Sequence, residues 1–262
     1  MDLGLKGRAA AVAAASKGLG RASALALAAE GCDVAICARG EDALRSVAKE
    51  IEALGVRAHA MTLDLAEPAA CERFVDSTAE TFGRLDVVVT NIGGPPSGPT
   101  ESFGDADLLA VLQRNLMVPV RLARAAVPHM RANGYGRILN ITSQAAKEPL
   151  DGLVLGNTAR SGIGAYMKTY SRELAPEGIT INTIAPGAHL TDRTYELSAQ
   201  RAEREGLDVE VVLRAWNAST PMGRIGDAAD FGAIVAFFAG MQTNFITGAT
   251  LVVDGGSARF VF

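Results

Sequence analysis

Short apolar segments alternate along this chain with longer segments of helical periodicity. The apolar segments are rich in Val, Ile and Ala and span residues 9–15, 33–38, 58–63, 85–90, 137–142, 180–185 and 250–253. The helical patterns span residues 19–30, 41–54, 68–82, 105–132, 157–175 and 228–239. Strands that are apolar on both faces and separated by helices are typical of a parallel sheet covered on each side. The pattern predicts an α/β fold, a single doubly wound Rossmann-like domain over residues 1–262, with its ligand crevice at the carboxyl ends of the strands.

One segment breaks this alternation. Residues 191–221 contain two short helical patterns and lie just before the last predicted helix. An insertion at this place follows the carboxyl end of a strand and therefore borders the crevice. We interpret it as a helical lid over a substrate, whose apolar residues at helical spacing pack on the body of the protein.

Composition narrows the possible partners. Apolar residues make up 48% of the 262, charged residues 21%, and the formal net charge is −4 without any basic block. Nucleic acid and anionic membranes are therefore not expected partners, and no apolar run has the length of a membrane span. The three cysteines and three histidines are scattered without metal-ligand spacing. This usage predicts a cytoplasmic protein with reduced cysteines and no metal.

A glycine-containing turn joins the first predicted strand to the first predicted helix. It reads Ala13-Ala14-Ala15-Ser16-Lys17-Gly18-Leu19-Gly20. Glycines let the backbone turn tightly and approach a pyrophosphate, which the N-terminus of the following helix attracts. The turn resembles the TGxxxGxG motif of the short-chain dehydrogenase/reductase family, including its 3-oxoacyl-ACP reductases. It matches that motif at Gly18 and Gly20 and departs from it at Ala13 and Ala14.

The second predicted strand ends in a position that distinguishes the two nicotinamide cofactors. An NAD site places an acidic residue there, about 20 residues beyond the glycine turn, to bind the ribose 2′-hydroxyl. This chain has Ala38 followed by Arg39, and Lys17 lies within the turn itself. Two cations without a carboxylate favour a 2′-phosphate, and hence NADP(H) as the cofactor, over a solvated pair of surface charges.

Further motifs of the family occur in the same order along the chain. Asp64 and Leu65 resemble the adenine-contacting pair, although Asp64 would equally well cap the next helix. The segment 90–94 resembles NNAG, 186–191 resembles PGxxxT beside the nicotinamide, and 254–256 matches the C-terminal DGG turn. The resemblance covers residues 5–256, and the cofactor-contacting residues it adds are Asp64, Leu65, Asn91, Gly93, Pro186, Gly187 and Thr191.

The chemical site departs from the family. Ser143 and Asn115 match the serine that binds the substrate oxygen and the asparagine that anchors a proton-relaying water. The YxxxK motif that supplies the proton-donating tyrosine and its lysine reads Gly156-Asn157-Thr158-Ala159-Arg160. The segment 172–178, RELAPEG, fixes this register without a gap.

The two replacements have different consequences. Glycine offers no proton donor, and a positioned acid–base group contributes about 10²–10⁴ in rate. Arg160 keeps a positive charge that can hold the cofactor ribose or stabilise a developing alkoxide, but it does not give up its proton. We therefore rank Ser143 with Arg160 first for catalysis, with Asn115 as the third catalytic candidate.

Other residues are weaker candidates for the missing proton donor. His189 has a suitable ordinary pKa, and Tyr195 opens the predicted lid, but for both a packing or exposed position is the better interpretation. Lys147, Glu148 and Asp151 lie between Ser143 and the altered motif and are expected to be solvated.

Two functions remain open. The first is an NADP(H)-dependent oxidoreductase that reduces a carbonyl-type small organic substrate with a non-standard proton donor. The second is a cofactor-binding protein without redox turnover, acting as a sensor or as the inactive partner of an oligomer. The resemblance also implies a homodimer or homotetramer, because the family packs the helices predicted at 105–132 and 157–175 against those of a neighbouring subunit.

Overall fold

Seven parallel strands form the central sheet of the computed structural model, which describes residues 1–261. Their order is β3-β2-β1-β4-β5-β6-β9. The strand order reverses between β1 and β4, and in such sheets the ligand crevice lies beside that reversal at the carboxyl ends. The strands are β1 (Ala9–Val12), β2 (Asp33–Ala38), β3 (Ala58–Thr62), β4 (Val87–Thr90), β5 (Gly136–Ile141), β6 (Ile179–Pro186) and β9 (Thr250–Val253).

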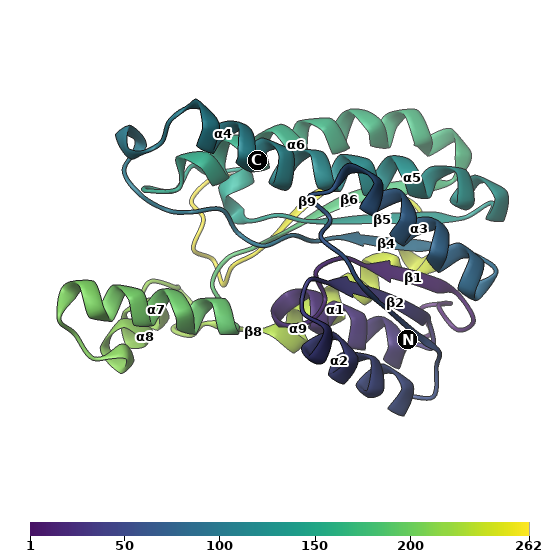
Figure 1. The fold of residues 1–262 in the computed structure, drawn as a ribbon, viewed down its shortest axis with the longest axis horizontal. Coiled ribbons are helices and arrows are strands. Elements are labelled where there is room, and N and C mark those ends of the chain that lie inside the picture. The colour runs from purple at the N-terminus through teal and green to yellow at the C-terminus, as the bar shows by residue number, and fades with distance from the viewer. Residues whose placement is uncertain (262) are drawn as a thin grey trace.

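Helices cover both faces of this sheet (Figure 1). One face carries α1 (Gly18–Ala29), α2 (Glu41–Ala53) and α9 (Ala228–Ala239). The other carries α3 (Pro68–Phe82), α5 (Val118–Asn133) and α6 (Val154–Leu174). The predicted doubly wound α/β fold is confirmed.

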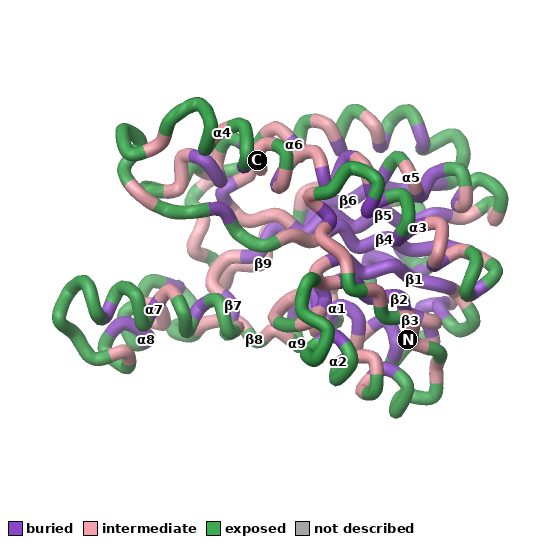
Figure 2. The backbone as a smooth tube through the Cα atoms, viewed as in Figure 1, coloured by how far each residue is buried: buried purple, intermediate pink, exposed green. Residues whose placement is uncertain are grey.

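The core therefore consists of two apolar layers, one on each side of the sheet. In β1, Ala9 and Ala11 face the layer of α3, α5 and α6, while Ala10 and Val12 face that of α1, α2 and α9. Figure 2 shows the inner strands buried. The edge strands β3 and β9 contain partly exposed positions, so the expectation of burial on both faces holds for the five inner strands only.

The first predicted strand is three residues too long. Strand β1 ends at Val12, and Ala14 adopts a left-handed conformation with φ of 48°. Among the described residues it is the one non-glycine residue with positive φ. The family motif has glycine at this place, so the tight turn is retained here in spite of the Cβ atom of alanine.

The helix predicted at 105–132 is interrupted by a different helix type. It consists of α4 (Asp105–Val111), a π-helical segment (Leu112–Met117) and α5. Single π-turns inside α-helices often occur at functional sites. Asn115 lies within this segment, and the sequence pattern gave no sign of the change in pitch.

The predicted lid forms two helices, α7 (Asp192–Glu205) and α8 (Val209–Ala218). At its base, β7 (His189–Leu190) pairs in parallel with β8 (Gly226–Asp227), a small sheet that the sequence pattern did not predict. In Figure 1 the two helices extend away from the sheet on the side of its carboxyl edge.

All three cysteines are free and buried, as predicted for reduced thiols. Burial raises the pKa of Cys37 to about 12, so its sulfur stays protonated. In residues 1–261, no helix combines the length and the hydropathy needed to cross a membrane.

The conformation of Ala14 generates a stability prediction. Ala14→Gly removes a left-handed strain of about 1–2 kcal/mol, while the added chain freedom of glycine costs about 0.5–1 kcal/mol. We expect a net stabilisation of up to about 1 kcal/mol, seen as a rise of roughly 2 °C in thermal unfolding. The matched control is Ala165→Gly on the exposed side of α6. Here glycine adds chain freedom without relieving any left-handed strain, so Tm should fall. A fall in Tm for both variants would contradict the strain at Ala14.

Candidate active site

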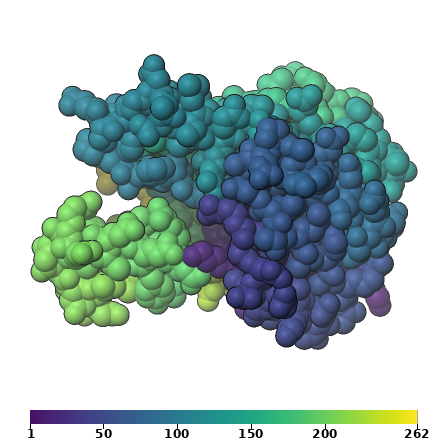
Figure 3. Space-filling view, in the orientation of Figure 1, coloured from purple at the N-terminus to yellow at the C-terminus, as the bar shows by residue number. Residues whose placement is uncertain are grey.

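A cavity of about 840 Å³ lies at the carboxyl edge of the sheet. Its walls come from the segments that follow β1 to β6 and from α7 and α8. Figure 3 shows the surface hollowed between these two helices and the lobe that carries α4. The predicted site residues that line it are Ser16, Lys17, Gly18, Leu19, Arg39, Asp64, Leu65, Asn91, Gly93, Ser143, Arg160, Pro186, Gly187 and Thr191.

The turn after β1 forms one end of the cavity. Gly18 has φ of 58°, a conformation that favours glycine. Helix α1 begins at this residue and has no acidic side chain in its first turn, so its N-terminal N–H groups and positive dipole end remain suited to an anion. This geometry fits a pyrophosphate.

Two predicted residues, Gly20 and Asn115, are buried behind the wall instead of lining the cavity. A Cβ atom on Gly20 would lie 2.4 Å from the Ala14 carbonyl oxygen and 2.7 Å from Asn91 Nδ2. Asn91 donates a hydrogen bond to that same carbonyl at 3.2 Å. Gly20 is therefore needed for the close packing of α1, the β1 turn and the loop after β4.

Asn115 supports the same loop from the other side. Its Nδ2 atom donates a 2.9 Å hydrogen bond to the Gly93 carbonyl oxygen, and its side chain is buried. The π-helical segment thus fixes the backbone at Gly93, which lines the cavity. A proton-relaying water at Asn115 stays a prediction.

The end of β2 presents a free cation. Arg39 is exposed, and within residues 1–261 it forms no ion pair. Lys17 instead pairs with Glu196 of α7 at 3.0 Å, with both side chains about half exposed. Arg193 lies 3.6 Å from the same carboxylate. The ion pair links the cofactor turn to the predicted lid.

Asp64 does not cap α3, because the N-cap residue of that helix is Glu67, which makes no side-chain cap hydrogen bond. The Asp64 Oδ1 accepts a 3.0 Å hydrogen bond from the Ala66 backbone N–H in the turn before α3. It also lines the cavity beside the buried Leu65. The two roles are compatible, because one carboxylate oxygen suffices for the turn.

The segment after β6 closes the opposite end. A Cβ atom on Gly187 would lie 2.5 Å from the Cβ of Asp254, so the PG and DGG turns pack directly on each other. Thr191 lines the cavity and its side chain caps the N-terminus of α7. The loop is held from both sides in the place expected for a nicotinamide-binding segment.

Ser143 follows β5 with a hydroxyl suited to a substrate oxygen. Its Oγ accepts a 3.2 Å hydrogen bond from the Ala145 backbone N–H, which leaves the hydroxyl proton available to donate. The neighbouring Thr142 also lines the cavity, and its Oγ1 atom is buried without a partner among the described residues. Buried hydroxyls without partners are rare and point to a polar ligand.

Arg160 occupies space beside Gly156. Helix α6 begins at Val154, three residues before the predicted start, so Gly156 lies in its first turn. A Cβ atom on Gly156 would lie 3.2 Å from Arg160 Nη1 and 3.2 Å from Pro95 Cγ. Burial lowers the pKa of Arg160, but a guanidinium stays charged in proteins.

Of the tyrosines and histidines near the site, His189 lines the cavity, but its ring is held by neighbouring groups. His189 is buried, its Nδ1 lies 3.2 Å from the Gly187 carbonyl, and its ring meets Phe231 edge-on at 5.2 Å. Burial lowers its pKa, although the Gly187 carbonyl opposes this effect. Tyr166 packs against the core with Tyr170, and Tyr195 is 48% exposed. Neither Tyr166 nor Tyr195 is among the described residues that line the cavity.

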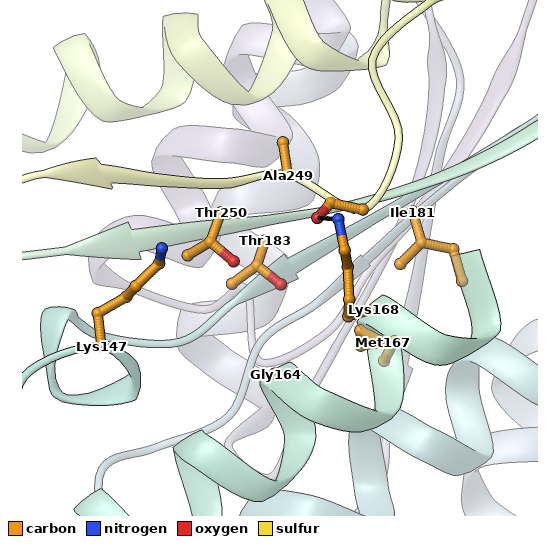
Figure 4. A pocket seen from close by; sticks show the side chains of 9 residues that line it. Lys147, Gly164, Met167, Lys168, Ile181, Thr183, Ala249 and Thr250 are labelled. Carbon is orange, nitrogen blue, oxygen red and sulfur yellow. Dashed lines mark hydrogen bonds between the residues drawn. The ribbon is translucent and has the colours of Figure 1, made fainter. Parts of the chain in front are cut away.

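A second, smaller cavity of about 250 Å³ lies between α6, β6 and β9 (Figure 4). Lys147 lines this smaller cavity and not the larger one, and its Nζ lies 5.3 Å from the Phe260 ring centre. Lys168 donates a 2.8 Å hydrogen bond to the Gly248 carbonyl oxygen. Lys147 thus borders this separate space, whereas Ser143 lines the larger cavity.

Sequence reasoning missed several cavity residues. Thr142, Gln144 and Glu196 all line it. Thr142 adjoins Ser143 in the chain, which was an available signal. The pairing of Glu196 with Lys17 joins residues 179 positions apart, and no local pattern predicts it.

Comparisons with known proteins agree with this geometry. Residues 13–258 match the family model described as enoyl-(acyl carrier protein) reductase. The short-chain reductase protein NovJ of Streptomyces niveus is 37% identical over 94% of this chain and 92% of its own. The 3-oxoacyl-[acyl-carrier-protein] reductase FabG of Escherichia coli is 32% identical over 97% and 98%. L-sorbose reductase of Gluconobacter frateurii, solved with NADPH and L-sorbose, superposes with a TM-score of 0.95 at 28% identity, over the full length of both chains.

The fold and the cavity therefore define an NAD(P)-dependent oxidoreductase. The chain belongs to the short-chain dehydrogenase/reductase family, as its motifs indicated. The replacement of that family's YxxxK tyrosine and lysine by Gly156 and Arg160 stays a prediction from the sequence. The homodimer or homotetramer inferred from the sequence stays a prediction.

The close approach at Gly20 gives a paired test. Gly20→Ala places a methyl group against a backbone carbonyl and should destabilise the protein by roughly 1–3 kcal/mol while weakening NADPH binding. Gly164→Ala is the control, because this helical glycine has open space at its Cβ position and alanine favours helix by about 0.5–1 kcal/mol. Thermal unfolding and NADPH fluorescence titration measure both effects. Equal stability of the two variants would contradict the packing role of Gly20.

Proposed function

We propose that this protein is an NADP(H)-dependent reductase of a carbonyl-type small organic substrate, working without a tyrosine proton donor. The observation that carries the proposal is that one cavity, the larger, brings three features together. These are the N-terminus of α1, which is suited to an anion, the unpaired Arg39 after β2, and the Ser143 hydroxyl with its proton available to donate. The L-sorbose reductase solved with NADPH supports it through the similarity of the whole fold.

The residues present fit a dinucleotide with a 2′-phosphate. Gly20 leaves the β1 turn compact beside α1, and Arg39 offers a guanidinium without a competing carboxylate in the described chain. Lys17 would exchange Glu196 for the phosphate, since charge-assisted hydrogen bonds to a doubly charged group are the stronger ones. When bound, the nicotinamide supplies a hydride.

The substrate oxygen lies, in this proposal, at Ser143. The Ser143 hydroxyl would donate a hydrogen bond to the carbonyl oxygen and polarise the carbonyl group for reduction. Arg160 supports the negative charge that develops on that oxygen through its own positive charge. Water provides the proton, because the guanidinium does not release one.

Several large apolar side chains also line the cavity. Leu150, Leu153, Leu197 and Trp216 line it together with these polar groups. They would contact an apolar portion of the substrate and limit the access of water, which strengthens the electrostatic interactions of Ser143 and Arg160.

Cofactor selectivity tests the binding half of the proposal. Wild-type protein should bind NADPH more tightly than NADH in a fluorescence titration. Arg39→Gln should weaken NADPH binding by about tenfold or more, the value of one hydrogen bond to a charged group, and leave NADH unchanged. Glu196→Gln frees Lys17 and should shift the NADPH affinity in the opposite direction. Equal affinity of the wild type for NADPH and NADH would refute the assignment to NADP(H).

Turnover tests the chemical half. NADPH oxidation would be followed with a panel of carbonyl compounds that includes L-sorbose and a 3-oxoacyl thioester. For any substrate found, Ser143→Ala should lower kcat by about 10²–10³-fold, as removal of an oxyanion donor does. An unchanged kcat would refute the role of Ser143.

The counterpart variant restores the lost motif. Gly156→Tyr combined with Arg160→Lys supplies a proton donor and should raise ketone reduction by about 10²-fold. Gly156→Tyr alone should gain less, because Arg160 Nη1 lies 3.2 Å from the new Cβ position. A double variant that binds NADPH but shows no gain would mean that α6 no longer presents residue 156 to the substrate.

A further inference from the structure

The guanidinium of Arg160 lies across the space that the absent side chain at position 156 leaves open. Nη1 is 3.2 Å from the ideal Cβ position of Gly156, and Nη2 is 3.7 Å from that of Gly94. The arginine side chain therefore turns back over the first turn of α6 toward the loop after β4. Gly156 and Arg160 therefore act as one structural unit. The Arg160 side chain fills part of the space that a side chain at position 156 would occupy.

This positive charge has no counterion. Within residues 1–261, Arg160 makes no ion pair and donates no hydrogen bond. Desolvation is the cause of its lowered pKa, and no carboxylate opposes that effect. Arg160 is half-buried in the wall of the cavity, so its charge is only partly desolvated and its guanidinium faces a space in which an anionic ligand could pair with it.

The charges around the cavity leave two cations in excess, because five cationic side chains line it against three carboxylates. Lys17 and Arg193 share Glu196, and Arg39 lies at the end of β2 with the proposed 2′-phosphate. The pyrophosphate has the N-terminus of α1.

Arg114 and Arg160 line the same cavity as Ser143 and have no such anion assigned to them. Of these two, Arg160 is the one whose guanidinium lies against the first turn of α6.

The hydroxyls of a cofactor ribose could accept hydrogen bonds from Arg160 but would leave its charge uncompensated. A carboxylate satisfies both requirements, because the planar guanidinium matches two carboxylate oxygens with parallel N–H donors. The first turn of α6 has no acidic residue and no side-chain cap, so the positive end of its dipole adds to the attraction.

We propose that Arg160 is a substrate-recognition residue that binds a carboxylate carried by the substrate, close to the carbonyl group bound by Ser143. This rests on the proposed function and specifies its substrate class as an oxo acid with an apolar body. The apolar body lies against Leu150, Leu153 and Trp216. The family's tyrosine–lysine pair has thus been exchanged for a carboxylate receptor.

The test uses carboxylates and their uncharged amides as probes. Phenylacetate and phenylacetamide, and hexanoate and hexanamide, are titrated by calorimetry into the full-length protein with and without saturating NADPH. We expect each carboxylate to bind at least about tenfold more tightly than its amide. Arg160→Gln should abolish this preference, and Arg160→Lys should keep part of it, because ammonium retains the charge without the planar fork.

Arg114→Gln is the matched control. Arg114 lines the same cavity and also has no ion pair in the described part of the chain. Its loss lowers the positive potential by the same one charge, so the carboxylate preference should persist in this variant. Equal loss in the Arg114 and Arg160 variants would assign the preference to the general field of the cavity and overturn the proposal.

Equal binding of carboxylate and amide by the wild type, or no binding of either carboxylate, would also overturn it. The NADPH titration on the same samples reports on the proposed function separately. A carboxylate preference without NADPH binding would leave the arginine receptor standing and refute the reductase. NADPH binding without a carboxylate preference would leave the proposed reductase standing and refute the arginine receptor.

Discussion

The site depends on a close contact between the turn after β1 and the loop after β4. Asn91 donates to the Ala14 carbonyl oxygen, and Gly20 passes so near both groups that no Cβ atom fits. Asn115 then fixes the same loop through the Gly93 carbonyl oxygen. These contacts join the ends of β1 and β4, between which the strand order reverses. The crevice lies there because the helices that follow these two strands go to opposite faces of the sheet.

Deeper in the sheet, polar side chains hold the ends of three adjacent strands in register. Thr90 donates to Asn140 at 2.9 Å, and Asn140 donates to Thr183 at 3.3 Å. All three are buried, and each satisfies another's hydrogen-bonding groups. Asn140 lies near the end of β5, just before Thr142 and Ser143 in the chain, so these hydrogen bonds support the strand end that leads to both residues. A rigid support of this kind fits a serine whose hydroxyl must meet a substrate oxygen at a fixed distance.

One end of the cavity combines a glycine at position 156 with the positive charge of Arg160. Gly156 carries no donor group, and the Arg160 guanidinium lies where it would contact a side chain at that position. A guanidinium is a fixed charge, which favours anionic groups and does not relay protons, so these two residues constrain both which substrates can bind and how a proton can be delivered.

Local sequence determined the order of strands and helices, because the apolar periodicities of 33–38 and 68–82 are properties of neighbouring residues. It also determined the composition of the glycine turn after the first strand and the presence of Gly156 and Arg160 four residues apart. Tertiary structure alone decided the direction of the Arg160 side chain, the pairing of Lys17 with Glu196 and the left-handed Ala14. Each of these depends on residues distant in the chain, such as Pro95 against α6, and side-chain placement follows from the space those residues leave.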